Sequence, residues 1–235
     1  MFSALFHGLS ESDKDNAIEN IIQHASPRQD FFLMLVLAIG MAVFGVLLQS
    51  IIVVIASMLI APLLYPLLSL ALGIIAADET LIVRSLYTIG KSVVLSLAGG
   101  FVIAFLFSPH QLNTAFLFGS GGSQASLIYA VIAAIAGFAA AFAMVKPHLN
   151  ETLPGVAIAV ALVPPLAVAG TALALFDWQL FSQALLLFLA NVIGILFSAM
   201  IVFALFRFST KKKVTEQAVK QEEKIVEKET KPQTA

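Results

Sequence analysis

The fold is decided by residues 31–77, which have the sequence FFLMLVLAIGMAVFGVLLQSIIVVIASMLIAPLLYPLLSLALGIIAA and contain no Asp, Glu, Lys or Arg. As one helix this stretch would be about 70 Å long, because an α-helix rises 1.5 Å per residue. A hydrocarbon core of about 30 Å needs only about 20 apolar residues. We therefore predict two membrane-spanning helices here, with the turn between them at Gln49-Ser50.

The composition of the whole chain agrees with a lipid environment. Of its 235 residues 60% are hydrophobic and 11% are charged, against about 45–50% and about 25% in soluble domains. The formal net charge of −1 excludes a nucleic-acid binder that works through bulk basicity. The absence of Cys excludes disulfides, thiolate nucleophiles and thiolate metal ligands.

Four further apolar stretches predict spans at about 86–107, 127–145, 153–176 and 180–206, which gives six in total. With the N-terminus inside, the outer connections around 49, at 108–126 and around 177 contain no Lys or Arg. The positive-inside rule therefore predicts that both termini are cytoplasmic. The inner flanks hold Lys14, Arg28, Arg84, Lys146, Arg207, Lys211, Lys212 and Lys213.

An internal repeat of three spans is the next feature. Residues 55–78 and 155–177 resemble each other, and Pro66 and Asp78 recur 99 residues later as Pro165 and Asp177. A duplicated unit of three spans must insert its second copy upside down, as in many secondary transporters. We predict an all-α integral membrane protein of two inverted three-helix repeats, at 31–107 and 126–207.

Two proline pairs mark the candidate site, because both fall near the middle of their spans. Each proline removes an N–H and leaves the carbonyl four residues earlier without its helical partner. Pro62, Pro66, Pro164 and Pro165 thereby affect the carbonyls of Met58, Pro62, Val160 and Ala161. An unpaired polar group in lipid costs several kcal/mol. We predict that the second and fifth spans are broken here and bind a small ion or solute; the alternative is a packing kink.

The candidate substrate-binding residues combine these positions with nearby polar side chains. They are Ser57, Met58, Pro62, Tyr65, Pro66, Ser69, Lys91, Val160, Ala161, Pro164, Pro165, Thr171 and Asn191. Lys91 has two interpretations: its side chain extends to the inner face of the membrane, or it binds an anion inside the bundle. Asn191 also fits an interhelical hydrogen bond.

No metal-binding or catalytic constellation is found. The four His residues lie outside the predicted spans without a companion four residues away, and no Asp, Glu or His within a span offers a general base. We expect no enzyme activity, no cofactor and no metal.

The two ends of the chain are polar. Residues 1–30 form an N-terminal segment in which Ser10 to Ala25 is predicted to be an amphipathic helix, lying on the inner membrane surface or against the bundle. Residues 208–235 are rich in Lys and Glu, and we predict a disordered tail. A short coiled coil seeded by Val214, Ala218 and Ile225 is the alternative. Small residues within the spans permit close helix contacts, and we expect a homo-oligomer.

The motifs at 55–66 and 154–166, IASMLIAPLLYP and PGVAIAVALVPPL, resemble those of the prokaryotic domain-of-unknown-function 389 family of hydrophobic membrane proteins. The stretch from Ala25 to Phe32 and the closing Asp78 also fit, and the likeness covers about 18–206. The resemblance implies a multi-pass protein of a prokaryotic plasma membrane. The family has no settled activity, so the resemblance implies no substrate.

Two functions fit the sequence. The first is a transporter or channel for a small ion or small solute, whose site lies between the proline-broken helices. The second is a membrane scaffold that transports nothing and recruits cytoplasmic partners through its N-terminal helix and C-terminal tail. The identity and charge of the substrate, its coupling and the oligomer number do not follow from the sequence.

Overall fold

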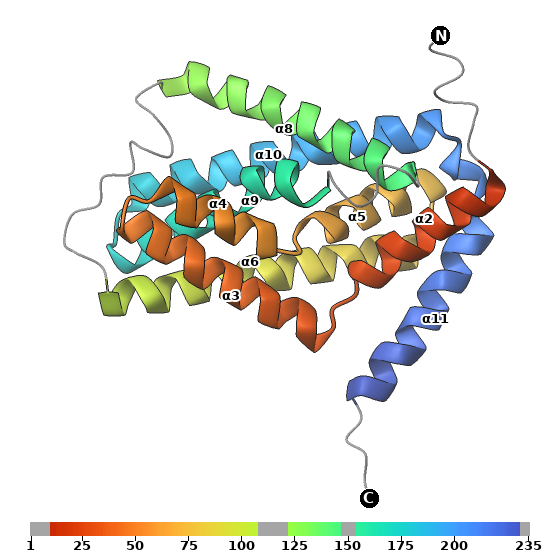
Figure 1. The fold of residues 1–235 in the computed structure, drawn as a ribbon, viewed down its shortest axis with the longest axis horizontal. Coiled ribbons are helices and arrows are strands. Elements are labelled where there is room, and N and C mark those ends of the chain that lie inside the picture. Colours follow the sequence, from red (N-terminus) through yellow and green to blue (C-terminus); the bar gives the residue numbers. More distant parts are fainter. Residues whose placement is uncertain (1–9, 108–121, 147–153, 231–235) are drawn as a thin grey trace, which may run out of the picture.

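The computed structural model describes residues 10–107, 122–146 and 154–230, except for the side chains of 122–127, 130, 154–161 and 229–230. Every regular element in these ranges is helical (Figure 1). The elements are α2 (Glu11–His24), α3 (Gln29–Leu47), α4 (Ile51–Ile60), α5 (Leu64–Ala76), α6 (Glu79–Phe107), α8 (Gly122–Val145), α9 (Pro154–Ala174), α10 (Trp178–Leu205), the short 3₁₀ helix η2 (Phe208–Thr210) and α11 (Lys212–Thr230).

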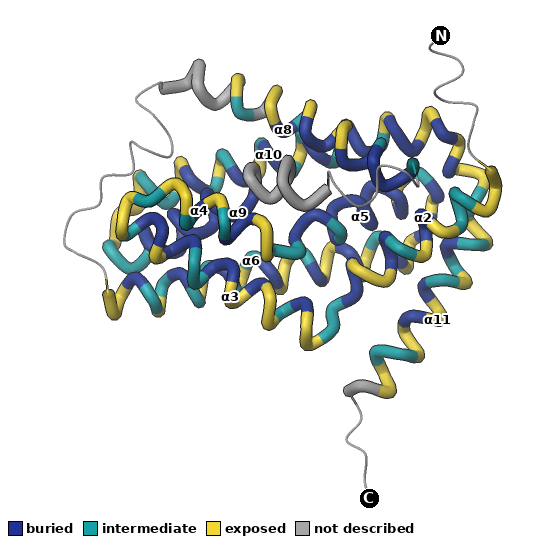
Figure 2. The backbone as a smooth tube through the Cα atoms, in the orientation of Figure 1, coloured by how far each residue is buried: buried dark blue, intermediate teal, exposed yellow. Residues whose placement is uncertain are grey.

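The apolar helices form one bundle. Helices α3 to α6 and α8 to α10 run along the long axis of the molecule, and α2 and α11 lie at the end where α6 begins (Figure 1). Helix α9 packs against α3, α4, α5, α6, α8 and α10, so it is the central helix. The buried residues gather along the inside of this bundle (Figure 2).

Several helices have the length and apolar character of membrane spans. Helices α3, α6 and α10 qualify singly, and α4 with α5 forms a fourth candidate that is bent by 50°. The described parts of α8 and α9 that were tested, Val131–Val145 and Leu162–Ala174, are shorter apolar helices. The structure therefore shows three or four candidate spans in the described residues, and six spans stay a prediction.

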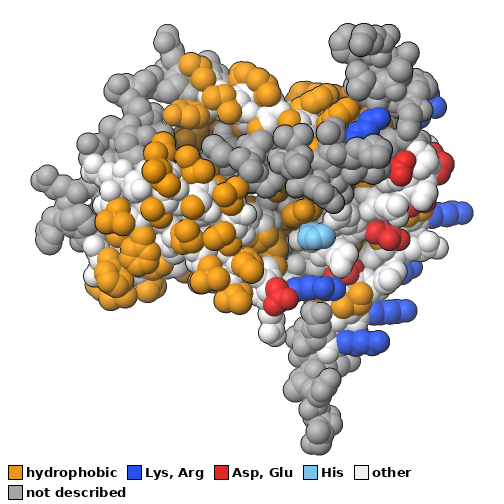
Figure 3. Space-filling model, viewed as in Figure 1, with side chains coloured by type: hydrophobic (Ala, Val, Ile, Leu, Met, Phe, Trp, Pro, Cys, Tyr) orange, Lys and Arg blue, Asp and Glu red, His pale blue; other side chains and the backbone are white. Residues whose placement is uncertain are grey.

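The surface is divided by chemistry. Large apolar side chains are exposed along the bundle, among them Ile52 at 77% and Phe105 at 68%. Charged side chains gather instead around α2 and α11 (Figure 3). Of the connections predicted to be free of Lys and Arg, 108–121 lies outside the described residues.

The turn predicted at Gln49-Ser50 is confirmed, and it belongs to a recurring corner geometry. Gln49 has a left-handed backbone with φ 53°, and the N–H of Ser50 bonds to the Gly45 carbonyl at 2.9 Å. Helices α3 and α4 are so close there that a Cβ on Gly45 would lie 2.9 Å from the Val54 backbone nitrogen. Glycine is therefore required at this position.

The corners between α5 and α6 and between α9 and α10 repeat this geometry 99 residues apart. Ala77 (φ 51°) and Phe176 (φ 57°) are left-handed, and the N–H of the next residue bonds to the carbonyl five residues earlier, at 3.0 Å in both corners. That next residue, Asp78 or Asp177, then caps the following helix by accepting from the N–H three residues later. These corners agree with the predicted repeat, and the inverted architecture stays a prediction.

The N-terminal helix packs against the bundle, as one of its two predicted locations requires. Helix α2 begins with a capping box in which the Ser10 hydroxyl accepts from the Asp13 N–H and the Asp13 side chain accepts from the Ser10 N–H. Its apolar face buries Ile18, Ile21 and Ile22 completely or nearly so. Helix α2 contacts α5, α8 and α11.

The predicted disorder of the tail is wrong for residues 212–230, which form α11. The helix is ordered by tertiary contacts that composition does not reveal: Val219 is buried, Arg28 pairs with Glu222 at 2.9 Å, and Lys211 pairs with Glu11 and Asp15. The apolar residues that suggested a coiled coil therefore serve packing within the chain, where α11 contacts α2, α5 and α6.

Candidate functional site

The break between α4 and α5 is the main irregularity of the bundle, and it lies about midway along the long axis (Figure 1). Helix α4 ends at Ile60, and Ala61 is extended with φ −72° and ψ 123°. The residue before a proline disfavours the helical conformation, so Pro62 explains this extended residue. Because Pro62 also lacks an N–H, the Met58 carbonyl has no donor four residues later. The predicted break in the second span is confirmed.

Pro66 has a different role from the one predicted. It is the third residue of α5, in the first turn, where a helix does not use its N–H groups. The carbonyl of Pro62 precedes α5 and therefore has no helical bond for Pro66 to remove. Pro62 interrupts the span, and Pro66 is simply compatible with the start of the next helix.

The predicted break in the fifth span is wrong. Helix α9 continues from Pro154 to Ala174 with Pro164 and Pro165 inside it. The two missing N–H groups still leave the carbonyls of Val160 and Ala161 without donors four residues later. The side chains of these two residues lie outside the described part of the chain.

Packing explains why α9 continues through two prolines. Residues 162–172 are all buried, and neighbours surround α9 on all sides. A Cβ on Gly170 would lie 2.8 Å from the Gly100 Cα, so α6 and α9 cross almost backbone to backbone. By contrast, α4 exposes much of its surface, with Ile52 at 77% and Leu59 at 55%. Tertiary contacts hold α9 in a helix and leave α4 free to end.

A stripe of hydroxyl groups along α6 was missed by the sequence analysis. Ser85, Thr88, Ser92 and Ser96 are all buried, with exposed fractions of 2% or less. Their spacing of three or four residues places them on one face of the helix, and Gly100 at the crossing with α9 continues that face. The same spacing was visible in the sequence and would have indicated the stripe.

Most hydroxyls of the interior are bonded locally. Ser92 donates to the Thr88 carbonyl at 2.7 Å, and Ser85 donates to Ser69 on α5 at 2.9 Å. Ser96 differs, because its buried Oγ has no hydrogen-bond partner among the described residues. An unsatisfied buried hydroxyl costs about 1–3 kcal/mol. Ser96 is therefore the position on the stripe whose hydroxyl has unused hydrogen-bonding capacity.

The structure brings most of the predicted polar residues into the interior. Ser57 and Thr171 are fully buried, and each donates to a carbonyl of its own helix, at 2.6 Å and 2.8 Å. Met58, Ser69 and Asn191 are buried as well. Tyr65 is half-buried, but its ring stacks on His24 of α2 with ring centroids 4.7 Å apart. This contact was not foreseen.

Lys91 is not part of this interior. It lies exposed on α6, with Nζ 4.1 Å from the centre of the Phe32 ring on α3, as in a cation–π contact. The anion-binding interpretation of Lys91 therefore gains no support, and the long side chain reaching along the outer surface is the arrangement observed.

The interior offers neutral oxygen atoms. Among the buried residues that the structure describes, the ionisable ones are Asp78, directly before α6, and Glu222, in α11. No group of three His, Cys, Asp or Glu in the described ranges is arranged to hold a metal ion. Carbonyls and hydroxyls suit a neutral solute or a monovalent cation better than an anion.

Comparison with known proteins places this fold in a family. No solved structure matches the chain. The uncharacterized protein MJ0678 of Methanocaldococcus jannaschii is 34% identical over 191 residues, which cover 79% of this chain. The match spans 57% of the length of that relative. The family model described as DUF389, a domain of unknown function, matches residues 58–197. These residues include the α4–α5 break, the hydroxyl stripe and α9, and the chain belongs to the DUF389 family.

Proposed function

We propose that this protein is a membrane transporter or channel for a small ion or small solute, and that its site lies at the α4–α5 break. The observation that carries the proposal is the interruption at Ala61-Pro62 midway along an apolar bundle. In lipid, non-helical backbone is tolerated only where it is buried in protein or lines a water-filled cavity. Transporters place such segments at their substrate sites.

The chemistry around the break narrows the substrate class. We propose that the path is lined by the Met58 carbonyl, by the central helix α9, which contacts both α4 and α6, and by the buried hydroxyl stripe of α6, all without charge. We propose a neutral solute or a monovalent cation as the substrate. Helix α9 acts as a wall, since it is buried from 162 to 172 and continues as a helix through its two prolines.

The proposed topology follows from the distribution of charge. Both ends of the described chain lie with α2 and α11 at the charged end of the bundle (Figures 1 and 3). We propose that this end faces the cytoplasm, with six spans in two inverted repeats in a prokaryotic plasma membrane. Assembly into a homo-oligomer also belongs to the proposal.

The test is transport by the purified full-length chain in liposomes. The panel contains K⁺, Na⁺ and small neutral solutes, and uptake of at least one of them above protein-free liposomes is expected. Pro62→Ala should abolish that uptake because it allows α4 to continue as a helix. Pro66→Ala is the matched control, since its proline lies in a first turn, and should retain uptake. No uptake across the panel, or equal uptake by Pro62→Ala and the unaltered chain, contradicts the proposal.

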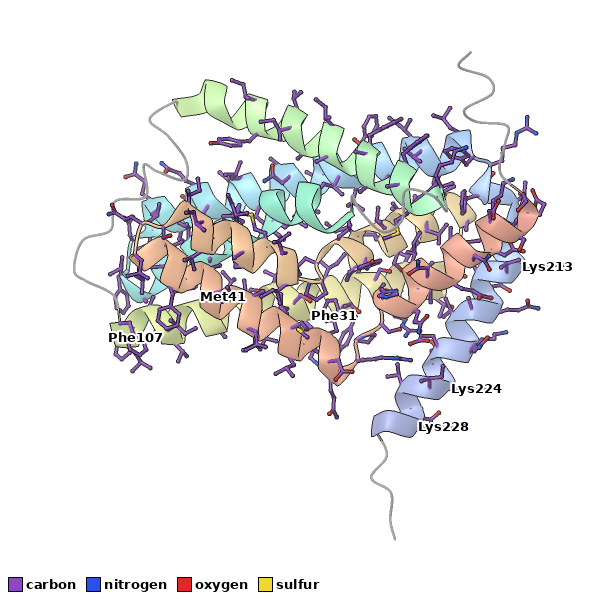
Figure 4. All side chains as sticks on the ribbon, in the orientation of Figure 1. Phe31, Met41, Phe107, Lys213, Lys224 and Lys228 are labelled. Atoms are coloured by element: carbon purple, nitrogen blue, oxygen red, sulfur yellow. The ribbon has the colours of Figure 1, made fainter. Side chains whose placement is uncertain are left out.

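A scaffold is the second candidate, and one observation favours it. Lys213, Lys224 and Lys228 of α11 project away from the body of the molecule (Figure 4), while Phe31, Met41 and Phe107 belong to the apolar bundle. Such a row of cations fits an acidic partner. Under this alternative, changing the three lysines to Gln abolishes complementation of a deletion strain, whereas Pro62→Ala has no effect. The transporter proposal requires the opposite pattern.

A further inference from the structure

The two repeated corners of the fold differ in one respect. Asp78 and Asp177 cap α6 and α10 through equivalent bonds, Oδ1 to the Leu81 N–H at 3.0 Å and Oδ1 to the Leu180 N–H at 2.9 Å. Asp177 is exposed, whereas Asp78 is only 3% exposed. The other oxygen of Asp78, Oδ2, has no hydrogen-bond partner in the described part of the chain. A helix cap needs only one oxygen, so the cap does not explain the burial of the second.

Helix α11 creates a pocket beside this corner. The hollow has a volume of about 570 Å³, within the range of small-molecule sites. Asp78 is one of its lining residues, and the wall opposite the start of α6 is α11. The full lining is Ala77, Asp78, Glu79, Thr80, Lys212, Glu216, Val219, Lys220 and Glu223.

The lining of the pocket carries more negative than positive charge, and Arg84, which lies next to the pocket, interacts electrostatically with Glu223. Four carboxylates face two lysines in this lining, and none of the ion pairs between described residues joins a pocket lysine to a pocket carboxylate. The carboxylates stand on both walls, Asp78 and Glu79 on one and Glu216 and Glu223 on the other. A ligand that satisfies both walls must carry positive charge at two separated points.

The apolar part of the lining fits a hydrocarbon spacer between those charges. Ala77 is exposed in the same hollow, and Val219 lines it from α11 with only 1% of its surface exposed. We propose that this pocket binds an aliphatic di- or polyamine, with ammonium groups donating to carboxylates on both walls and methylenes against Ala77 and Val219. Charge-assisted hydrogen bonds of this kind are about twice as strong as neutral ones. The site is independent of the proposed transport function.

The experiment titrates spermidine into the purified full-length chain in nonionic detergent without added lipid, by calorimetry at constant ionic strength. Saturable binding is expected, together with a rise in the thermal midpoint, because a ligand that binds only the folded state stabilises it. Mg²⁺ at equal charge concentration serves as the comparison and should not replace spermidine. Absence of saturable binding, or equal displacement by Mg²⁺, overturns the proposal.

The repeat supplies a matched pair of variants. Asp78→Asn keeps an oxygen that can cap α6 and removes the charge, so spermidine affinity should fall by roughly tenfold or more. Asp177→Asn makes the same change at the equivalent corner and should leave the affinity unaltered. Glu216→Gln on the opposite wall tests the site again should Asp78→Asn fail to fold. Equal affinity in all folded variants contradicts the assignment.

Discussion

The two proline-bearing segments of this chain, α4–α5 and α9, meet the loss of backbone N–H groups in opposite ways. Pro62 ends a helix, while Pro164 and Pro165 lie inside one. The difference lies in their surroundings, because α9 is buried from 162 to 172 and α4 exposes five of its ten residues. A proline therefore opens a span where neighbours do not enforce the helix. The comparison identifies the α4–α5 break as the candidate site and α9 as a structural helix.

The largest fall in the thermal midpoint is expected from disturbing the packing that surrounds the continuous helix α9. Gly100→Leu places a side chain where even a Cβ would lie 3.0 Å from the Gly170 Cα. Overpacking of this kind costs about 1–3 kcal/mol or more, and a large fall in the thermal midpoint of the purified protein is expected. Gly90→Leu on the same helix is the control, because a Cβ there meets nothing within 4 Å. Equal midpoints for the two variants would show that the crossing does not stabilise α9.

Restoring an N–H to α9 should change the thermal midpoint less than Gly100→Leu does, and in the opposite direction. A proline in a helix interior costs about 3 kcal/mol relative to Ala, and part of this is offset by the apolar surface that the ring buries. Pro164→Ala is expected to raise the thermal midpoint and to retain transport. Loss of transport in a stable Pro164→Ala variant would show that the α9 prolines also belong to the site.

The hydroxyl stripe gives the next prediction. Ser96→Ala removes a buried Oγ that has no described partner and should stabilise the protein by about 1 kcal/mol. The same variant should lower uptake in liposomes, because a hydrogen-bonding group is lost from the proposed path. Ser92→Ala is the comparison, since its hydroxyl already donates to Thr88. Higher stability with unchanged uptake would show that the hydroxyl stripe does not line the path.

The smallest effect concerns the pairing of α2 with Lys211, the residue directly before α11. Hydrogen bonds from Lys14 and Lys211 lower the pKa of Glu11 from 4.5 to about 2, and bonds to Asp15 and Glu11 raise the pKa of Lys211 above 10.5. A lowered acid pKa stabilises the fold above pH 4.5, and that contribution is lost as the pH falls through about 2. The raised pKa of Lys211 stabilises the fold fully below pH 10.5, and this contribution is lost as the pH rises through the raised pKa. Thermal midpoints of Glu11→Gln and the unaltered chain should therefore differ slightly and constantly between about pH 5 and 10, and converge in acid or high salt. A difference that persists unchanged at pH 2 contradicts this pairing.

Much of the fold was predictable because it follows from local patterns. The uncharged run 31–77, the turn at Gln49-Ser50, the amphipathic helix α2 and the break at Pro62 all depend on nearby residues. The continuity of α9 and the order of α11 depend on tertiary contacts, such as the approach of Gly170 to Gly100 and the pairing of Arg28 with Glu222. The spacing of residues within α9 or α11 does not reveal these tertiary contacts. The α6 hydroxyls were predictable from their spacing but were not recognised.

The central claim is that water reaches Ser57 beside the α4–α5 break, whereas Thr171 inside α9 stays dry. The chain contains no Cys, so single-cysteine variants can be compared directly. Ser57 and Thr171 form a matched pair, since both are fully buried and both donate to a carbonyl of their own helix. The measurement is the labelling rate of Ser57→Cys and Thr171→Cys in membranes by a small charged thiol reagent. The account predicts that Ser57→Cys reacts and Thr171→Cys does not; no reaction at position 57, or equal reaction at both positions, would contradict it.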